Sequence, residues 1–409
     1  MLGKALKISR TVLEGSTFVK ALSPPAKAKW IVSRVQDMGP TYVKLGQFLS
    51  SRADILGPDD IKALKKLQDS SNPLPWAEVQ NIVNMNGFAG IDEIPIASAS
   101  IGQVHRGRLV DGTEVVIKVR RPGIVSEIAE DIKLLDSLFD GMGLIPGIGV
   151  DKMVDCKRIV SDLRNMILNE TDFEREVKNM ELMIAQYPDI IIPRPYLPLC
   201  TSEMIVMTYV PSVKFTNTVS SRSKLAYALM DSFVQQFLQH GLIHGDPHEG
   251  NVALSSIEAD TFVMYDLGHV VELDQNVRSL MKVLVFELMT ENVDGVIDAI
   301  ERMPEIISIR DPAQVRTFIK RYIEYVKTID IRVLSSLDSR DENLPIRFSS
   351  TVFEIVRIFG IVEGICLTLD PKFEYSRVFL KYVDTLVLDR DFLEYKAGKD
   401  LEKIWKWIT

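Results

Sequence analysis

The chain has 409 residues, of which 46% are hydrophobic and 25% charged, so it is long enough for two or three packed lobes of a soluble type. Its formal net charge of -8 gives no overall basic surface and argues against nucleic acid as a partner. Three cysteines, Cys156, Cys200 and Cys366, lie far apart and suggest no disulfide framework, which favours an intracellular, reducing compartment. No apolar run is long enough to predict a transmembrane helix.

A basic segment covers residues 1–35. Between Met1 and Arg34 the Lys and Arg residues are accompanied by a single acidic residue, Glu14. This composition is typical of an organelle-targeting peptide or of a helix that lies on a membrane surface. A solvated basic helix that packs on the acidic remainder of the chain fits equally well. The sequence leaves these alternatives open, and peripheral membrane contact is one of them.

Residues 36–92 are predicted to form a helical extension. Gly39-Pro40 favours the start of a helix, because proline is tolerated in the first helical turn. The stretch "TYVKLGQFLSSRADIL" then places apolar residues at helical spacing. Two prolines within residues 72–75 end this pattern, and a second short helix is expected over residues 76–85.

A smaller, strand-rich lobe is predicted over residues 93–211. The stretch "SIGQVHRGRLVDGTEVVIKVR" contains two β-rich runs around Asp111-Gly112, a dipeptide that favours a hairpin turn. Helices are expected over residues 125–140 and 152–187, and "EMIVMTYV" has the length and composition of a short buried strand.

The last lobe, residues 212–409, is predicted to be mainly helical. The polar, small-residue stretch 244–255 and the strand-like "TFVMYD" are the expected interruptions. This order of elements predicts an α+β fold with a helical N-terminal extension, a small sheet lobe and a larger helical lobe, and a cleft between the lobes.

The segment "HGDPHEGN", residues 244–251, carries the first chemical signal. A phosphoryl-transfer site needs a carboxylate that orients or deprotonates the acceptor, and an oxygen ligand nearby for Mg²⁺. Asp246 and Asn251 lie five residues apart in one loop and fit these two functions. In isolation the same residues are common in ordinary turns.

The segment "TFVMYDLG" supplies a second carboxylate. Asp266 follows an apolar strand directly, with Gly268 two residues later. A carboxylate at the end of a buried strand is well placed to bind a metal beside the first loop. The two segments, in this order and spacing, favour a metal-assisted site over two unrelated turns.

Lys118 interrupts the apolar strand "GTEVVIKV". A charge in an apolar strand is costly unless it meets an anion, although a lysine in an edge strand is usually solvated. In a kinase-like site the anions are nucleotide phosphates and a glutamate from a neighbouring helix. Candidate counter-charges for Lys118, and for Lys44 in its own apolar setting, crowd the stretch "LNETDFEREVKNM", where Phe173 is expected to point inward.

Together these segments resemble the UbiB family of atypical kinases, the ADCK proteins of eukaryotes, over residues 30–400. The resemblance rests on "KLGQ" at 44–47, the Ala-rich stretch "PIASASIGQVHRG", "ETDFERE", the loop "HGDPHEGN" and the triplet "DLG". It implies a bilobal protein-kinase-like fold that binds ATP (or ADP) and Mg²⁺.

The resemblance also implies a function for each matching residue. Lys118 would contact the phosphates and pair with Glu176, Asp246 would be the catalytic base, and Asn251 and Asp266 would be the Mg²⁺ ligands. Lys44 and Gln47 would project into the cleft, with Lys44 near Glu170 and Asp172. Met207 would line the adenine pocket, with Thr208 to Val210 as the hinge. The loop over the phosphates would consist of Ala97, Ser98, Ala99, Ser100, Ile101, Gly102 and Gln103.

The expected activity is Mg²⁺-dependent ATP hydrolysis or phosphoryl transfer to a small molecule or lipid. Only a short stretch, "DLGHVVELDQ", separates Asp266 from the next predicted helix, which leaves little room to dock a peptide. Alanines where protein kinases carry glycines should alter nucleotide selectivity, because they restrict the backbone. The family resemblance implies a link to isoprenoid-quinone or lipid metabolism, with a lipid or quinone precursor as a ligand.

Two other classes of protein share parts of this pattern. A phosphotransferase of the aminoglycoside or choline kinase type has an "HGD…N" loop, but it accounts for neither "KLGQ" nor the Ala-rich loop. A nucleotide-dependent scaffold or pseudokinase would keep the fold without an acceptor, although all polar site positions are present here. Phosphate release would distinguish the scaffold from the enzyme.

Overall fold

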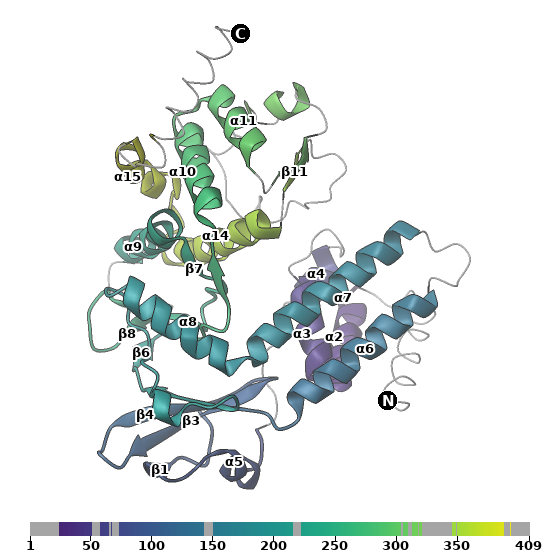
Figure 1. Ribbon diagram of the computed structural model, residues 1–409, viewed down its shortest axis with the longest axis vertical. Coiled ribbons are helices and arrows are strands. Elements are labelled where there is room, and N and C mark those ends of the chain that lie inside the picture. Colours follow the sequence, from purple (N-terminus) through teal and green to yellow (C-terminus); the bar gives the residue numbers. More distant parts are fainter. Residues whose placement is uncertain are drawn as a thin grey trace. The chain divides into compact units, whose positions relative to one another are not determined.

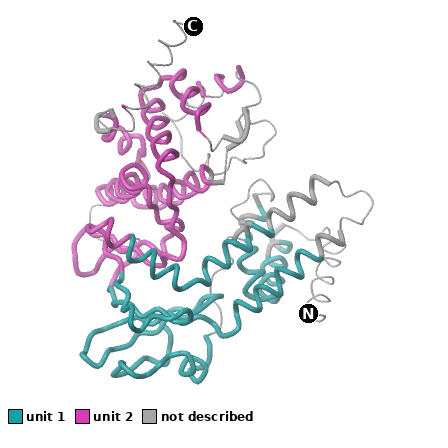
Figure 2. The backbone as a smooth tube through the Cα atoms, in the orientation of Figure 1, with its two compact units in different colours: residues 1–182, 193–210 teal, residues 183–192, 211–409 magenta. Residues whose placement is uncertain are grey.

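The computed structural model describes residues 24–50, 58–64, 67, 73–142, 150–215, 222–303, 306–309, 313–317, 319–320, 346–348, 350–387 and 393. The chain divides into two compact units (Figure 2): residues 1–182 with 193–210 form unit 1, and residues 183–192 with 211–409 form unit 2. Most of the basic segment (residues 1–23) and the last residues of the chain (394–409) lie outside the described residues.

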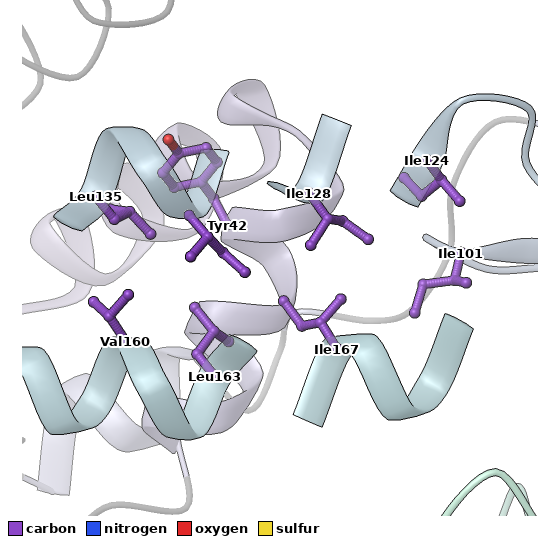
Figure 3. Packing of buried hydrophobic residues seen from close by; sticks show 9 residues of the cluster. Tyr42, Ile101, Ile124, Ile128, Leu135, Val160, Leu163 and Ile167 are labelled. Atoms are coloured by element: carbon purple, nitrogen blue, oxygen red, sulfur yellow. The ribbon is translucent and has the colours of Figure 1, made fainter. Parts of the chain in front are cut away.

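The helical part of unit 1 comprises α2 (Pro24–Met38), α3 (Pro40–Ser50), α4 (Pro58–Leu64), α6 (Ile124–Met142) and α7 (Val150–Thr171). The apolar faces of α2, α3, α6 and α7 meet in one core, in which Tyr42 of α3 lies among isoleucines and leucines of α6 and α7 (Figure 3). A Cβ on Gly46 would lie 2.3 Å from Leu67 Cδ1, so the glycine of "KLGQ" allows α3 to approach its neighbours closely.

The sheet of unit 1 is antiparallel (Figure 1). It contains β1 (Phe88–Ile91), β2 (Ala97–Ser98), β3 (Gly102–Leu109), β4 (Glu114–Arg120) and β5 (Met204–Thr208), in the order β1-β3-β4-β5 with β2 beside β3. Along β4 the buried residues Val115, Ile117 and Val119 alternate with partly exposed ones, so Lys118 lies on the opposite face. The short helix α5 (Trp76–Ile82) contributes to the core on the Val115 side.

Unit 2 is mainly helical (Figure 1). Its helices are α9 (Arg222–Gln235), the short η4 (Gln236–His240), α10 (Gln275–Met289), α11 (Val293–Arg302), α14 (Ser350–Leu369) and α15 (Ser376–Val387). Among the described residues, three small antiparallel sheets accompany them: β7 (Leu242–His244) with β10 (Val270–Glu272); β6 (Ser212–Val213), β8 (Val252–Ser255) and β9 (Phe262–Met264); and β11 (Ile306–Ile309) with β12 (Ile346–Phe348). The described helices include none long and apolar enough to cross a membrane.

The α+β class predicted from the sequence is confirmed. The hairpin at Asp111-Gly112 forms between β3 and β4, where Gly112 has a φ of 89° and Asp111 accepts a hydrogen bond from the Thr113 N–H. The strand predicted from "EMIVMTYV" is β5, and "TFVMYD" contains β9.

Two features differ from the sequence prediction. The helix expected over 152–187 is two helices, α7 and α8 (Phe173–Gln186), which are separated at Asp172 because the Asp172 side chain caps the start of α8. Residues 88–91, expected to be helical, form β1. The helical extension and the strand-rich lobe lie in one compact unit, and the domain boundaries predicted at residues 35, 92 and 211 stay a prediction.

Candidate functional site

Lys118 and Glu176 form a buried ion pair within unit 1. The Lys118 Nζ donates to both carboxylate oxygens of Glu176, each at 2.8 Å. Lys118 comes from the middle of β4, and Glu176 from the first turn of α8, where a carboxylate is favoured by the helix dipole. The Glu176 residue is only 1% exposed. This is the pairing that the family resemblance implied.

The start of α8 assembles several of the predicted residues. Phe173 is buried and its ring centroid lies 5.3 Å from the Lys118 Nζ, so the lysine has an aromatic face as well as a carboxylate beside it. Lys44 of α3 pairs with Glu170 of α7 at 2.8 Å. Asp172 accepts from the N–H of Arg175 and therefore caps α8.

The Gln47 side chain is used inside the helical extension. Its Nε2 donates to the Leu67 carbonyl at 3.3 Å. Gln47 lies three residues from Lys44 on α3, yet the two side chains have different partners in unit 1. The expected joint projection of Lys44 and Gln47 into a cleft remains a prediction.

The Ala-rich loop is held by an arginine that the sequence did not indicate. The Arg121 Nε donates to the Ala99 carbonyl and its Nη2 donates to the Ser98 Oγ, both at 3.0 Å. The Arg121 N–H also donates to the Ile101 carbonyl at 2.8 Å. Arg121 follows β4 by one residue, so the strand that carries Lys118 also anchors this loop.

Two loop residues have structural functions that limit what they can offer a nucleotide. The Gln103 side chain is 1% exposed; its Oε1 accepts from the Leu74 N–H at 2.7 Å and its Nε2 contacts His105 at 2.7 Å. A Cβ on Gly102 would lie 2.5 Å from the Val119 carbonyl oxygen, so only glycine fits against β4 there. The Gln103 amide therefore belongs to the core of unit 1, and only its backbone remains as a candidate for contact with phosphate.

The predicted hinge lies at the end of β5. Met207 pairs with Val116 in the sheet, and the Thr208 Oγ1 accepts from the Arg194 N–H at 2.9 Å. Val210 is the last residue of unit 1 before the chain enters unit 2 at Pro211.

His244 is the centre of the second group of predicted residues, which lies in unit 2. It is fully buried at the end of β7; its Nδ1 accepts from the Asp246 N–H at 3.2 Å, and its Nε2 lies 3.0 Å from the Tyr265 carbonyl. A backbone N–H can only donate and a carbonyl can only accept, so the ring is neutral with its proton on Nε2. Burial lowers the pKa of His244 from 6.5 to about 4, although nearby carboxylates oppose this effect.

Strand pairing brings Asn251 and Asp266 to the same end of one small sheet. Val252 of β8 pairs with Met264 of β9, and the Tyr265 N–H donates to the Asn251 carbonyl at 2.8 Å. Asp266 has a φ of 52°, a left-handed conformation that costs about 1 kcal/mol or more for a residue other than glycine and that recurs at functional sites.

Asn251 and Asp266 are the residue types that could hold a divalent cation. The Asn251 Nδ2 donates to the Asp246 carbonyl at 3.1 Å, which leaves the amide oxygen, the atom that binds hard cations, on the other side. Among the described residues no cluster of three or more His, Cys, Asp and Glu side chains could hold a metal ion. One carboxylate and one amide suit Mg²⁺, which usually keeps waters and substrate phosphates as its other ligands.

Helix α14 contributes contacts to this group that the sequence did not predict. Arg357 donates through Nη2 to the Gly245 carbonyl at 2.9 Å, and its Nη1 lies 3.7 Å from Asp246 Oδ1. Glu354 lies 2.5 Å from the Nε2 of His269, the residue after "DLG". No local motif marks Glu354 or Arg357, because both lie far along the chain from the residues they contact.

The predicted site residues are therefore collected into two groups, one in each unit. Unit 1 holds the lysine, its glutamate, the Ala-rich loop and the "KLGQ" helix, and unit 2 holds Asp246, Asn251 and Asp266.

Comparison with known proteins identifies similar sequences over most of the chain. A family model described as the ABC1 atypical kinase-like domain matches residues 66–300, more than half of the chain. The Arabidopsis thaliana chloroplastic protein ACTIVITY OF BC1 COMPLEX KINASE 8 is 26% identical over 440 residues, which cover 94% of this chain and 57% of that protein. An uncharacterized protein of Synechocystis sp. is 25% identical over 374 residues, 86% of this chain and 63% of the relative. The chain thus spans less than two thirds of the length of these relatives.

A solved structure shares the fold. The complex of Rv3197 with erythromycin from Mycobacterium tuberculosis superposes with a TM-score of 0.58 at 21% sequence identity, over 80% of this chain and 87% of that chain.

Proposed function

Because the chain belongs to the family of ABC1 atypical kinase-like domains, we propose that it binds ATP (or ADP) with Mg²⁺ and either hydrolyses ATP or transfers its terminal phosphoryl group to a small molecule or lipid. A kinase-like domain implies nucleotide binding as the general function. Beyond this general function, we propose the acceptor, the metal and the function of each residue.

In this proposal Lys118 binds the nucleotide phosphates and Glu176 holds the lysine in position. Lys118 is already paired with a carboxylate and an aromatic ring, so its ammonium is fixed before a ligand arrives. The backbone of the Ala-rich loop, braced by Arg121, covers the phosphates. Met207 and the segment 208–210 contact the adenine. Lys44, Gln47, Glu170 and Asp172 form a regulatory part of the extension.

Asp246 orients or deprotonates the acceptor hydroxyl, or a water in hydrolysis, and Asn251 and Asp266 hold Mg²⁺. When bound, Mg²⁺ would neutralise the charge that develops on the phosphate oxygens. The observation that carries the proposal is the convergence of these residues: His244 and the β8–β9 pairing tie Asp246, Asn251 and the backbone before Asp266 together. A set of plain turn residues would not require a buried neutral histidine between them.

The short stretch after Asp266 favours a small acceptor over a peptide. Residues 270–272 form β10, which pairs with β7, and Asp274 already caps α10 through the Asn276 N–H. The segment that protein kinases use to dock peptides is therefore occupied by a strand and a helix cap. This supports hydrolysis or transfer to a small molecule or lipid.

The first test is phosphate release from ATP by the full chain with and without Mg²⁺, for the wild type and Asp266→Asn. We expect Mg²⁺-dependent release that falls by at least about 10²-fold in the variant, because it removes a charged metal ligand. Asp260→Asn is the matched control: Asp260 is also left-handed, with a φ of 57°, but it is exposed and paired with Lys224. It should retain wild-type turnover.

The same assay separates the alternatives. Nucleotide binding without phosphate release in any condition would favour the scaffold or pseudokinase, and equal turnover by wild type and Asp266→Asn would contradict the proposed metal site. Rapid phosphorylation of generic proteins would overturn the choice of acceptor.

We also propose that the acceptor belongs to lipid or isoprenoid-quinone metabolism at a membrane surface. The support is the sequence resemblance to the UbiB proteins and the similarity to a chloroplastic relative. Adding lipid vesicles and quinone-precursor analogues to the phosphate-release assay tests this point, because an acceptor or activator should increase ATP turnover.

A further inference from the structure

Gly245, the residue between His244 and Asp246, is held on three sides. Its N–H donates to the His269 carbonyl at 2.9 Å, and its carbonyl accepts from the Arg357 Nη2 at 2.9 Å. An added Cβ would lie 2.0 Å from the Cδ2 of His269, so the imidazole ring packs directly on the glycine Cα. The backbone that carries Asp246 is therefore fixed by His269 and Arg357.

Both of these contacts are anchored on α14. Glu354 and Arg357 lie three residues apart, on one face of the helix. The Glu354 carboxylate can only accept, so the Nε2 of His269 donates to it across 2.5 Å. Burial by itself raises the pKa of Glu354. The hydrogen bond and charge of His269 and the charge of Arg357 lower it, and together they outweigh burial, so the pKa of Glu354 lies below its usual range. The carboxylate is thus charged at neutral pH.

Arg357 also supplies charge beside Asp246. Its Nη1 lies 3.7 Å from Asp246 Oδ1, and the His248 Nε2 lies 3.6 Å from Asp246 Oδ2. Both distances are longer than a good hydrogen bond, so the charge of Arg357 orients the carboxylate without locking it. A base that must accept a proton from a substrate needs this freedom.

We propose that Glu354 and Arg357 are positioning residues of the phosphoryl-transfer site: from one face of α14 they fix Gly245, and thereby the backbone that presents Asp246. Glu354 acts through the ring of His269, and Arg357 acts through the Gly245 carbonyl and its charge beside Asp246. Because His269 follows Asp266 by three residues, the same helix holds the segments on both sides of the metal ligands. This inference rests on the proposed function of Asp246.

The first experiment measures hydrogen exchange of the backbone amides within residues 245–248, namely those of Gly245, Asp246 and His248, in the full chain without ligand. Arg357→Met keeps the aliphatic stem but removes the donors and the charge, so these amides should exchange faster. The matched control, Arg377→Met, removes an exposed arginine of the same unit that pairs with Glu374 at 2.7 Å, and it should leave residues 245–248 unchanged. Unchanged exchange in Arg357→Met would overturn the positioning of the loop.

The second experiment measures kcat and KM for Mg²⁺-ATP. Arg357→Met should lower kcat by about 10²-fold with little change in KM, because a shift of the base by an ångström affects the reaction more than it affects nucleotide binding. Arg357→Lys keeps a donor and a positive charge, so it should recover more of kcat than Arg357→Met does. A purely packing function predicts the reverse order, because Met fills the same volume without burying a charge.

A double variant tests whether the two residues act on one target. Glu354→Gln keeps the shape of the side chain but removes its charge, and we expect a smaller loss of kcat than for Arg357→Met. Because both residues act through Gly245, Glu354→Gln with Arg357→Met should cost less than the product of the single effects. Multiplicative losses would contradict a common target. If the wild type shows no Mg²⁺-dependent turnover, the proposed function fails, whereas the exchange experiment still decides the positioning.

Discussion

His244 connects two backbone segments of unit 2 through one neutral ring. Its Nδ1 accepts from the Asp246 N–H and its Nε2 donates to the Tyr265 carbonyl. A second proton, on Nδ1, would therefore face another donor. This arrangement gives the histidine a measurable signature in the pH dependence of stability, because its pKa differs between the folded and unfolded chain.

We predict that the free energy of unfolding falls as the pH decreases from 6.5 to about 4. In this range the unfolded histidine, with its ordinary pKa of 6.5, binds a proton, whereas folded His244, with a pKa of about 4, does not. Its contribution is fully present above pH 6.5 and is lost as the pH falls through the folded value, up to about 3 kcal/mol. Urea denaturation at a series of pH values measures it.

His244→Gln should reduce this dependence on pH, because the titrating group is gone. The control is His240→Gln, which removes an exposed histidine from the same unit and should keep the wild-type slope. Identical slopes for wild type and His244→Gln would contradict a buried neutral ring.

At the scale of elements, the β3–β4 pairing determines where the Ala-rich loop and Lys118 lie. Gly102 pairs with Arg120 at the open end of the hairpin, where the Ala-rich loop enters β3, and Lys118 pairs with Val104. The break between α7 and α8 acts similarly, since it separates Glu170, the partner of Lys44, from Glu176, the partner of Lys118. Small shifts of either element would move the proposed phosphate contacts.

We predict that Gly102→Ala destabilises the protein by about 1–3 kcal/mol, the usual cost of overpacking. The new Cβ would lie 2.5 Å from the Val119 carbonyl oxygen, and a backbone atom can yield only if the strand moves. The midpoint of urea denaturation, followed by circular dichroism, measures the change.

Gly90→Ala in the neighbouring strand β1 is the control for this substitution. Nothing lies within 4 Å of its added Cβ, and its φ is not positive, so it should be neutral or slightly stabilising. Equal effects of the two substitutions would show that Gly102 is not required by close strand approach.

At the scale of the whole molecule, the proposed nucleotide binds the folded chain but not the unfolded chain, and it should therefore stabilise the folded state. We predict a higher melting temperature with Mg²⁺-ATP, equivalent to about 2.7 kcal/mol when the free nucleotide is a hundredfold above its dissociation constant. Thermal denaturation with ATP, ADP and no nucleotide measures this, and the comparison of ATP with ADP reports the selectivity of the Ala-rich loop.

Lys118→Ala should abolish most of this shift, because it removes the ammonium proposed to bind the phosphates. Lys224→Ala removes an exposed lysine that pairs with Asp260, and it should preserve the shift. An undiminished shift in Lys118→Ala would argue that the nucleotide binds elsewhere.

Much of the proposed site could be predicted from the sequence, because its signals are local. Lys118 in an apolar strand, the hairpin at Asp111-Gly112 and a carboxylate after "TFVMY" are each visible within ten residues. Short strands such as β7 and β10 were missed, since three residues carry too little periodicity to be distinguished from a loop.

The amino-acid sequence by itself determined the family, the α+β class and the residue types of the two chemical groups, because spacing within a segment survives folding. Only the tertiary structure decided which side chains surround them. It shows that the Gln103 side chain lies in the core of unit 1 and that Arg121 holds the Ala-rich loop. It also shows that Arg357 contacts Gly245 directly and Glu354 through His269. These contacts join residues distant in the chain through packing of whole elements, and no local pattern encodes such a meeting.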